Sequence, residues 1–408
     1  MGALDMHMTT GEVIRRIRKS IGMTQAELGE LINFSQPAVS GLERGGPAAY
    51  DLRVLRLVAR ALQVPLAILV VESDEEADVD RRQFFRVGAL GSVGVAAMAT
   101  AGSASAPAVP GMKIGVSDVA AVQDTINQIH ALDLVVGGDR LCHVAAGQVR
   151  YVQHLLNSAS YTETVGKSLA TTAAETMTAA GWVHYDAGQL DQARRYYADA
   201  AHTATAADDD IAGAHALINA SVLSYREGAR QREGIHLADA AQTTARRRGG
   251  PQLRALGALR EAEAQGVVGD TNAMNKAISR AYRAYESGRG YDPEWVYLPE
   301  AELRGLTGLA YMNTGDHKTA TTHLQAAIDS SAAWPREHTG WRVYLAENLV
   351  RAGQFAEGCS LLTADYKTIG NVASARFQRH LDAITLAVRR QHAVPEVKEF
   401  LELRAVGA

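Results

Sequence analysis

Cysteine is nearly absent from this chain. Cys142 and Cys359 are the only two in 408 residues, they lie far apart in the sequence, and neither belongs to a CxxC motif. Their scarcity excludes a small scaffold stapled by disulfide bonds and a zinc site built on cysteine pairs. It indicates a reduced, cytoplasmic protein, because disulfide bonds accumulate in oxidising compartments.

Aromatic residues and net charge are also low. Phe, Trp and Tyr make up 6% of the chain, whereas hydrophobic residues make up 47%. A core with few aromatic side chains and abundant alanine favours closely packed helices over a β architecture. The formal net charge is only -4, so any affinity for nucleic acid must be local. The length predicts two or three domains.

Signatures of catalysis and metal binding are missing. The thirteen histidines are scattered, with no HExxH motif and no Cys/His spacing of the zinc type. No arrangement of side chains indicates a nucleophile with its base. The sequence therefore predicts a protein that is not an enzyme, with no catalytic residue, no metal ligand and no cofactor.

What the sequence does contain is a helix-turn-helix pattern at residues 24–45, TQAELGELINFSQPAVSGLERG. Thr24 followed by Glu27 predicts a capping box, in which the two side chains satisfy backbone N–H groups at the start of a helix. Residues 33–34 fall at a turn, and Ser35 is positioned to cap a second helix. Two short helices either side of a tight turn are therefore expected.

These residues resemble the phage-repressor-type helix-turn-helix of the XRE family, and the domain is expected to cover residues 10–72. The similarity lies in Gln25, in the Ser35–Gln36 pair and in V-S-x-L-E-R-G from Val39 to Gly45. It implies a five-helix DNA-binding bundle whose second motif helix enters the major groove. The candidate DNA contacts are Gln25, Ser35, Gln36, Ala38, Ser40, Arg44, Arg15 and Lys19.

The chemistry of these side chains suits DNA recognition. Gln36 can pair with the N6 and N7 edge of adenine, and Gln25 and the serines can hydrogen-bond phosphate oxygens. Contacts that release counterions are expected from the basic residues Arg44, Arg15, Arg16, Arg18 and Lys19. Two simpler interpretations stay open: Ser35 only caps its helix, and the arginines are only solvated. Gly41 stands where, as the resemblance implies, relatives carry a long polar or basic residue.

Residues 73–115 are predicted to be a linker with an apolar segment rich in alanine and glycine. Within residues 81–106, RRQFF and the uncharged run that follows resemble a twin-arginine export signal. Such a signal normally lies at the N-terminus, and here the predicted DNA-binding domain precedes it. An interdomain linker is the favoured interpretation. Attachment to a membrane is the alternative, because the run has about the length of a span although it is only weakly apolar.

Residues 116–408 repeat a helical hairpin. The predicted turns lie at Gly188, Gly228, Gly269, Gly315 and Gly353, which are spaced by 38 to 46 residues. Residues 177–200, 308–327 and 346–362 resemble tetratricopeptide repeats, whose small residues let two helices approach closely. The spacings exceed the roughly 34 residues of that repeat, so we expect an irregular α-solenoid of tetratricopeptide-like hairpins.

The predicted fold is thus all-α, with a DNA-binding bundle followed by a helical-repeat region. The predicted function is a cytoplasmic, sequence-specific transcriptional regulator that dimerises and binds operator DNA. Resemblance to regulators with XRE heads and repeat bodies implies that the repeats bind a signalling peptide or a small molecule. The candidate ligand residues are Asn219, Tyr225, Arg304 and Asn348, and burial in the packing is the other interpretation of each.

A second function is compatible with the same pattern. The repeats would bind a protein partner, and the head would place that partner on a promoter or on a membrane. Peptide binding and partner docking use the same kind of repeat surface, so the sequence does not separate the two.

Overall fold

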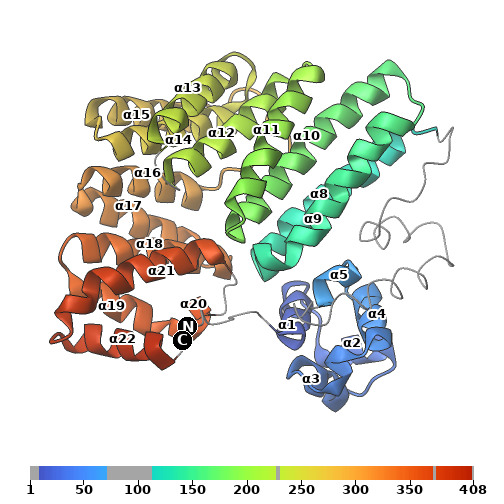
Figure 1. The fold of residues 1–408 in the computed structure, drawn as a ribbon, viewed down its shortest axis with the longest axis horizontal. Coiled ribbons are helices and arrows are strands. Elements are labelled where there is room, and N and C mark those ends of the chain that lie inside the picture. Colours follow the sequence, from blue (N-terminus) through green and yellow to red (C-terminus); the bar gives the residue numbers. More distant parts are fainter. Residues whose placement is uncertain (1–8, 71–112, 227–229, 371–373, 407–408) are drawn as a thin grey trace. The chain divides into compact units, whose positions relative to one another are not determined.

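The computed structural model describes residues 9–70, 113–226, 230–370 and 374–406 (Figure 1). Over these ranges the chain is helical, and no strand is present beyond an isolated bridge between Lys113 and Ser160. The all-α class predicted from the composition is therefore confirmed. By their contacts the described residues divide into two compact units, one within residues 9–166 and the other within residues 167–406.

The N-terminal helices form the bundle expected from the sequence. They are α1 (Thr10–Ser20), α2 (Gln25–Ile32), α3 (Gln36–Glu43), the 3-10 helix η1 (Pro47–Tyr50), α4 (Leu52–Ala61) and α5 (Leu66–Leu69). The predicted capping box starts α2, and a second one, between Thr9 and Glu12, starts α1. Between residues 10 and 69 the structure therefore contains the five predicted α-helices, with η1 in addition.

The core of this bundle comes from one apolar face of each helix. The buried side chains include Val13, Ile14, Ile17, Leu28, Ile32, Val39, Leu42, Leu55, Val58, Ile68 and Leu69. In α3 the buried positions Val39 and Leu42 lie three residues apart and so share a face. The opposite side of α3 is left to solvent. A helical pair, α8 (Val116–Val136) and α9 (Gly138–Ser158), completes the described part of this unit.

The rest of the chain consists of stacked helical hairpins. Its helices are α10 (Glu163–Asp186), α11 (Leu190–Ala206), α12 (Asp210–Arg226), α13 (Gln231–Arg248), α14 (Pro251–Val268), α15 (Thr271–Ser287), α16 (Glu300–Thr314), α17 (His317–Ser330), α18 (Pro335–Arg351), α19 (Phe355–Ala364), α20 (Tyr366–Gly370), α21 (Ala375–Val388), η2 (Arg389–Gln391) and α22 (Pro395–Val406). From α11 to α19, neighbouring helices lie side by side (Figure 1). This is the arrangement of an α-solenoid.

The hairpin turns depend on glycine in the left-handed region. Gly188, Gly269, Gly315 and Gly353 have φ angles of 79°, 82°, 81° and 81°, and each follows the first helix of a hairpin. A residue with a Cβ is strained at such angles, so glycine is the natural choice. These four predicted turns are confirmed, whereas Gly228 lies outside the described residues.

Small residues bring the two helices of a hairpin together, as the repeat resemblance implied. A Cβ built on Gly181 of α10 would lie 2.4 Å from the ring of Tyr197 in α11. One built on Gly308 of α16 would lie 2.8 Å from Cγ of Leu324 in α17. The larger side chain of each pair thus fills the space that its glycine leaves.

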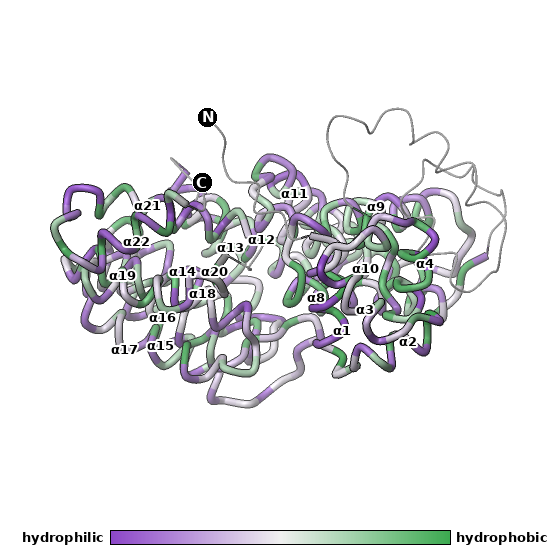
Figure 2. Tube along the Cα trace, turned by 90° about the horizontal axis from the view of Figure 1, so that it is seen from below, coloured by the Kyte–Doolittle hydropathy of each residue, from purple (hydrophilic) through white to green (hydrophobic). Residues whose placement is uncertain are grey.

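The second helices of the hairpins, such as α13 and α15, have a buried side and a solvated side, whereas α14, α16 and α18 are buried almost all round. Hydrophobic and hydrophilic residues alternate at short intervals along the helices (Figure 2). One core cluster runs from Ala214 of α12 to Phe377 of α21 and is filled by leucine and alanine with a few aromatic rings. A second cluster joins α18 and α19 to α21 and α22.

Three further sequence predictions concern single features. Cys142 and Cys359 are both buried, and neither forms a disulfide bond. The twin-arginine-like segment at 81–106 and most of the predicted linker lie outside the described residues. None of the helices within the described ranges has the length and apolar character that crossing a membrane requires.

Candidate functional site

The turn between α2 and α3 fixes the angle at which α3 leaves the bundle. Asn33 ends α2 in the left-handed conformation, with a φ of 58°. The backbone N–H of Phe34 then donates to the carbonyl oxygen of Gly29 at 2.8 Å. A Cβ on Gly29 would lie 2.4 Å from the carbonyl oxygen of Phe34, so only glycine permits this close turn.

The first turn of α3 is exposed and polar. Ser35, Gln36, Pro37 and Ala38 are all exposed, because Val39 and Leu42 occupy the buried side of the helix. Ser35 stands at the N-cap position, but its side chain makes no capping hydrogen bond. The interpretation of Ser35 as a simple cap is therefore wrong. Its hydroxyl is left on the surface, where it can meet another oxygen such as that of a phosphate.

A chain of hydrogen bonds holds Gln36 in place. Its Nε2 donates to Oε1 of Gln25 at 2.5 Å, and Nε2 of Gln25 donates to Oε2 of Glu43 at 2.7 Å. A glutamine amide carries two N–H donors and an acceptor oxygen. Gln36 can therefore keep its bond to Gln25 and still offer one N–H and its oxygen to the edge of an adenine. This preorganises the residue most suited to base recognition.

This series of hydrogen bonds ends in a buried ion pair between Arg18 and Glu43. Nε and Nη2 of Arg18 donate to the two carboxylate oxygens of Glu43 at 2.5 and 3.1 Å, and the side chains are 7% and 3% exposed. Burial acts to raise the pKa of Glu43. Hydrogen bonds from Arg18 and Gln25, together with the Arg18 charge, outweigh that effect, so its pKa lies below the ordinary value. Glu43 is thus an anion that anchors α3 to α1.

This ion pair corrects one prediction. Arg18 was expected to join the basic run that meets phosphates, but it is buried and its donors go to Glu43 and to the carbonyl oxygen of Met23. Arg15 and Lys19 on the same helix are exposed, and so is Arg44. Arg44 donates to Oγ of the half-buried Ser40 at 3.1 Å. The positive charge that this face offers to DNA is therefore smaller than the sequence suggested.

Glu43 and Gly41 are two further positions of α3 that bear on this site. Glu43 was not singled out by the sequence reasoning, although a charged residue directly after the buried Leu42 of an apolar helix face was a usable signal. Gly41 has nothing within 4 Å of the place where a Cβ would stand. The α3 surface is therefore open at Gly41, and a longer side chain fits there without displacing a neighbour.

The candidate ligand residues of the repeats are mostly committed to packing. Asn348 is fully buried, and its Nδ2 donates to the carbonyl oxygen of His317 and to Oγ1 of Thr321, at 3.0 and 2.9 Å. Asn219 is 9% exposed and donates to the carbonyl oxygen of His215 in its own helix. The Asn348 amide thus joins α18 to α17, whereas that of Asn219 bonds within α12, and ligand contact by these two residues stays a prediction.

The other two candidates pair with carboxylates. Tyr225 is 3% exposed, and its hydroxyl donates to Oε2 of Glu263 at 2.8 Å. Arg304 is half-buried and pairs with Glu300 at 3.3 Å, with its guanidinium over the ring of Tyr282. Neither pair of contacts indicates a bound molecule, so ligand contact by these two residues stays a prediction.

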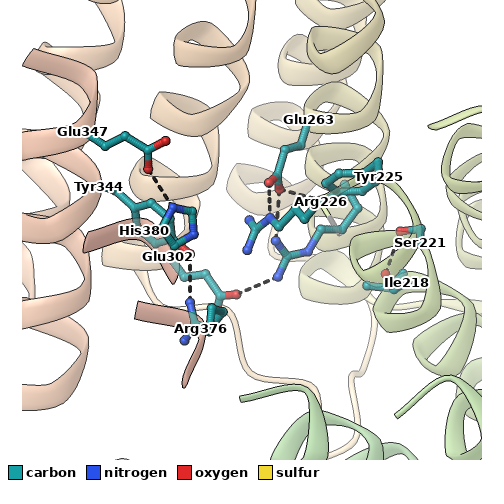
Figure 3. Close-up of polar contacts among 11 residues, drawn as sticks. Ile218, Ser221, Tyr225, Arg226, Glu263, Glu302, Tyr344, Glu347, Arg376 and His380 are labelled. Atoms are coloured by element: carbon teal, nitrogen blue, oxygen red, sulfur yellow. Dashed lines mark hydrogen bonds and ion pairs between the residues drawn. The ribbon is translucent and has the colours of Figure 1, made fainter. Parts of the chain in front are cut away.

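A pocket that the sequence reasoning missed lies among the first helices of the hairpins. It has a volume of about 60 Å³, and Trp182, Arg226, Arg260, Glu302, Trp341 and Arg376 line it, one from each of α10, α12, α14, α16, α18 and α21. Figure 3 shows Arg226 and Glu263 facing Tyr344 and Arg376 across Glu302. No sequence motif could reveal this pocket, because its residues are spread over nearly 200 positions.

The arginines of the pocket are held by hydrogen bonds to Glu263 and Tyr344. Glu263 accepts from Nη1 of Arg260 at 3.1 Å and from Nε of Arg226 (Figure 3). Burial acts to raise the pKa of Glu263, but the charges of both arginines outweigh it and the pKa is lowered. On the other side, Nη1 of Arg376 donates to the hydroxyl of Tyr344 at 2.9 Å. The guanidinium groups are therefore fixed rather than free to rotate.

The match to a protein-family model agrees with the geometry of the helix-turn-helix. Residues 14–69 match the helix-turn-helix family, so this segment is a helix-turn-helix domain. Among solved structures, the chain is similar to Bacillus thuringiensis PlcR, in the crystal structure of its complex with the peptide PapR7 and DNA. The identity is 16% and the TM-score 0.28, over 68% of this chain and 95% of the PlcR chain. The comparison with curated proteins gave no match.

Proposed function

We propose that this protein is a transcriptional regulator that binds operator DNA through α3 and responds to a ligand bound by its helical repeats. The observation that carries the DNA-binding part is the exposed first turn of α3, in which Gln36 is held by Gln25, which is itself held by Glu43. Such a turn can enter a major groove with its hydrogen-bonding groups already oriented. Arg15, Lys19 and Arg44 would contact the phosphates on either side.

The same proposal includes a dimer and a cytoplasmic location. One helix-turn-helix domain contacts few base pairs, and regulators of this kind reach operator affinity by placing two domains on half-sites one helical turn apart. A regulator of transcription works where the chromosome is. The two buried cysteines, neither of which forms a disulfide bond, suit a reducing compartment.

The test of DNA binding is selection from random duplexes with the full chain, followed by affinity measurements on the selected sequence. Gln36→Ala should weaken specific binding by about 1–3 kcal/mol and relax the preference at one base pair. Arg15→Ala should weaken binding to all sequences nearly equally and make it less dependent on salt. Arg232→Ala, an exposed arginine in α13, is the control and should change neither.

The outcomes separate the roles clearly. Equal losses on selected and random DNA for Gln36→Ala would remove Gln36 as a base reader. Failure of the full chain to select any sequence at low salt would overturn the proposed function.

A further inference from the structure

Several donors in the α10–α21 pocket have no acceptor. Nε of Arg260, Nη2 of Arg226 and Nε1 of Trp341 are buried and make no hydrogen bond in the structure. Arg260 and Trp341 are 4% and 7% exposed. Buried polar groups in folded proteins are almost always paired, because an unpaired one loses its hydration without compensation. Three such donors around one cavity call for a ligand that accepts hydrogen bonds.

The carboxylates around the pocket do not supply acceptors for these three donors. Among the described residues, no carboxylate oxygen that lines the pocket is both buried and unpaired. Glu302 accepts from Nη2 of Arg260 at 3.4 Å, and Glu263 accepts from both neighbouring arginines. The three unpaired donors therefore need an acceptor from a bound molecule. A charged acceptor makes stronger hydrogen bonds to guanidinium groups than a neutral one.

The walls of the pocket are aromatic. Trp182, Trp341, Tyr344 and Phe377 line it, and the guanidinium carbon of Arg376 lies 5.4 Å from the Trp182 ring centre and 4.2 Å from that of Phe377. Flat apolar surfaces next to fixed guanidinium groups suit a ligand with an acid group beside an apolar group. The cavity of about 60 Å³ limits what is enclosed to roughly one such unit.

We propose that this pocket binds the carboxylate of the ligand, with an adjacent apolar group of the ligand against Trp182 and Trp341. The proposal rests on the proposed function, since it names the chemistry of the ligand that the repeats would take. A carboxylate is favoured over a phosphate because Glu302 and Glu337 also line the pocket and would repel a second negative charge. The carboxylate can belong to a small organic acid or to the C-terminus of a peptide.

Calorimetric titration of the full chain tests the chemistry with matched acids and amides. The probes are phenylacetate against phenylacetamide, N-acetyl-Leu-Phe against its C-terminal amide, and inorganic phosphate. Each acid should bind about tenfold or more tightly than its amide, because the amide loses charge-assisted hydrogen bonds. The tighter of the two acids identifies the source as a small acid or a peptide end. Equal binding of acid and amide, or tighter binding of phosphate, would overturn the proposal.

Two substitutions test the geometry. Trp341→Phe keeps a ring over Gly305 but removes the unpaired N–H, so binding of the acid should fall about threefold to tenfold while the amide changes less. Trp334→Phe, at an exposed tryptophan that does not line the pocket, should have no effect. Glu302→Gln should tighten binding of the acid by removing a like charge. Equal effects of the two tryptophan variants would contradict the assignment.

DNA binding is measured on the same preparations, so the two proposals fail separately. If the chain selects an operator but neither acid binds better than its amide, only the carboxylate pocket is wrong. If an acid binds as expected and no DNA sequence is selected, the pocket stands and the regulatory function falls.

Discussion

Replacing Arg18 by methionine should destabilise the DNA-binding bundle severely. The Arg18 side chain donates to both oxygens of Glu43 and to the carbonyl oxygen of Met23, so the substitution leaves a buried carboxylate without its cation. Removing one partner of a buried ion pair costs about 3–5 kcal/mol. A domain of this size has a free energy of unfolding of roughly 3–9 kcal/mol. The variant should therefore lose at least about a third of the free energy of unfolding of its N-terminal helices.

The double substitution separates the charge from the packing. Glu43→Leu alone should also destabilise the bundle, because it leaves a buried guanidinium. Arg18→Met combined with Glu43→Leu replaces the pair by apolar side chains, and its stability should return close to that of the wild type. Hydrogen exchange of the α1 and α3 amides in the full chain measures this locally. Arg15→Met, on the exposed face of α1, is the matched control and should shift stability by less than about 0.5 kcal/mol.

The ion pair also makes the stability of the bundle fall at acid pH. Because the pKa of Glu43 is lowered in the folded state, its contribution is fully present above the unfolded pKa of about 4.3. The contribution is lost as the pH falls through the lower, folded value. The double variant should lack this part of the pH dependence. Two results would refute the reasoning. One is a free energy of opening from hydrogen exchange of Arg18→Met within about 1 kcal/mol of the wild type, and the other is a destabilisation of the double variant equal to the sum of the two single ones.

Three other outcomes are expected. Gly41→Ala should stabilise α3 by about 1 kcal/mol in urea unfolding, and Gly41→Arg should tighten binding to random duplex DNA, since the site has room for a side chain; a loss of stability would show that the glycine is needed. Gly181→Ala should destabilise the repeats by about 1–3 kcal/mol through contact with Tyr197. Gly213→Ala, whose Cβ would lie 3.7 Å from Ala204, should be tolerated, and equal effects would contradict the packing argument. Deletion of residues 111–408 should leave a folded head that binds the operator much more weakly, and unchanged affinity in a gel-shift titration would exclude dimerisation by the repeats.

Local chemistry made much of the fold predictable. The Thr24–Glu27 capping box and the glycines at the hairpin turns depend only on residues a few positions apart, and the structure places them as expected. Pro299 and Pro335 likewise mark the starts of α16 and α18, where a missing backbone N–H does no harm. Such features are readable because the sequence neighbours are also the spatial neighbours.

What failed was any assignment that needed to know which side chains meet across helices. Arg18 sits among exposed basic residues in the sequence, and only the position of Glu43 on α3 shows that it is buried. Asn348 carries an amide of the kind that contacts ligands, but its hydrogen-bond partners are on α17. The arginines of the pocket come from separate hairpins, so neither motif nor spacing connects them.

Asp186 has a consequence for how the repeat region loses its structure. This fully buried carboxylate at the end of α10 accepts from Arg336, 150 residues away, and from Ser374 and Arg376, which are 188 and 190 residues away. Repeat arrays in which each module touches only its neighbours can fray from either terminus. Here hydrogen bonds join α10, at the start of the repeats, to α18 and α21, near their end. Local unfolding at one end must therefore also break contacts at the other. Melting should accordingly be all-or-none across the array rather than module by module.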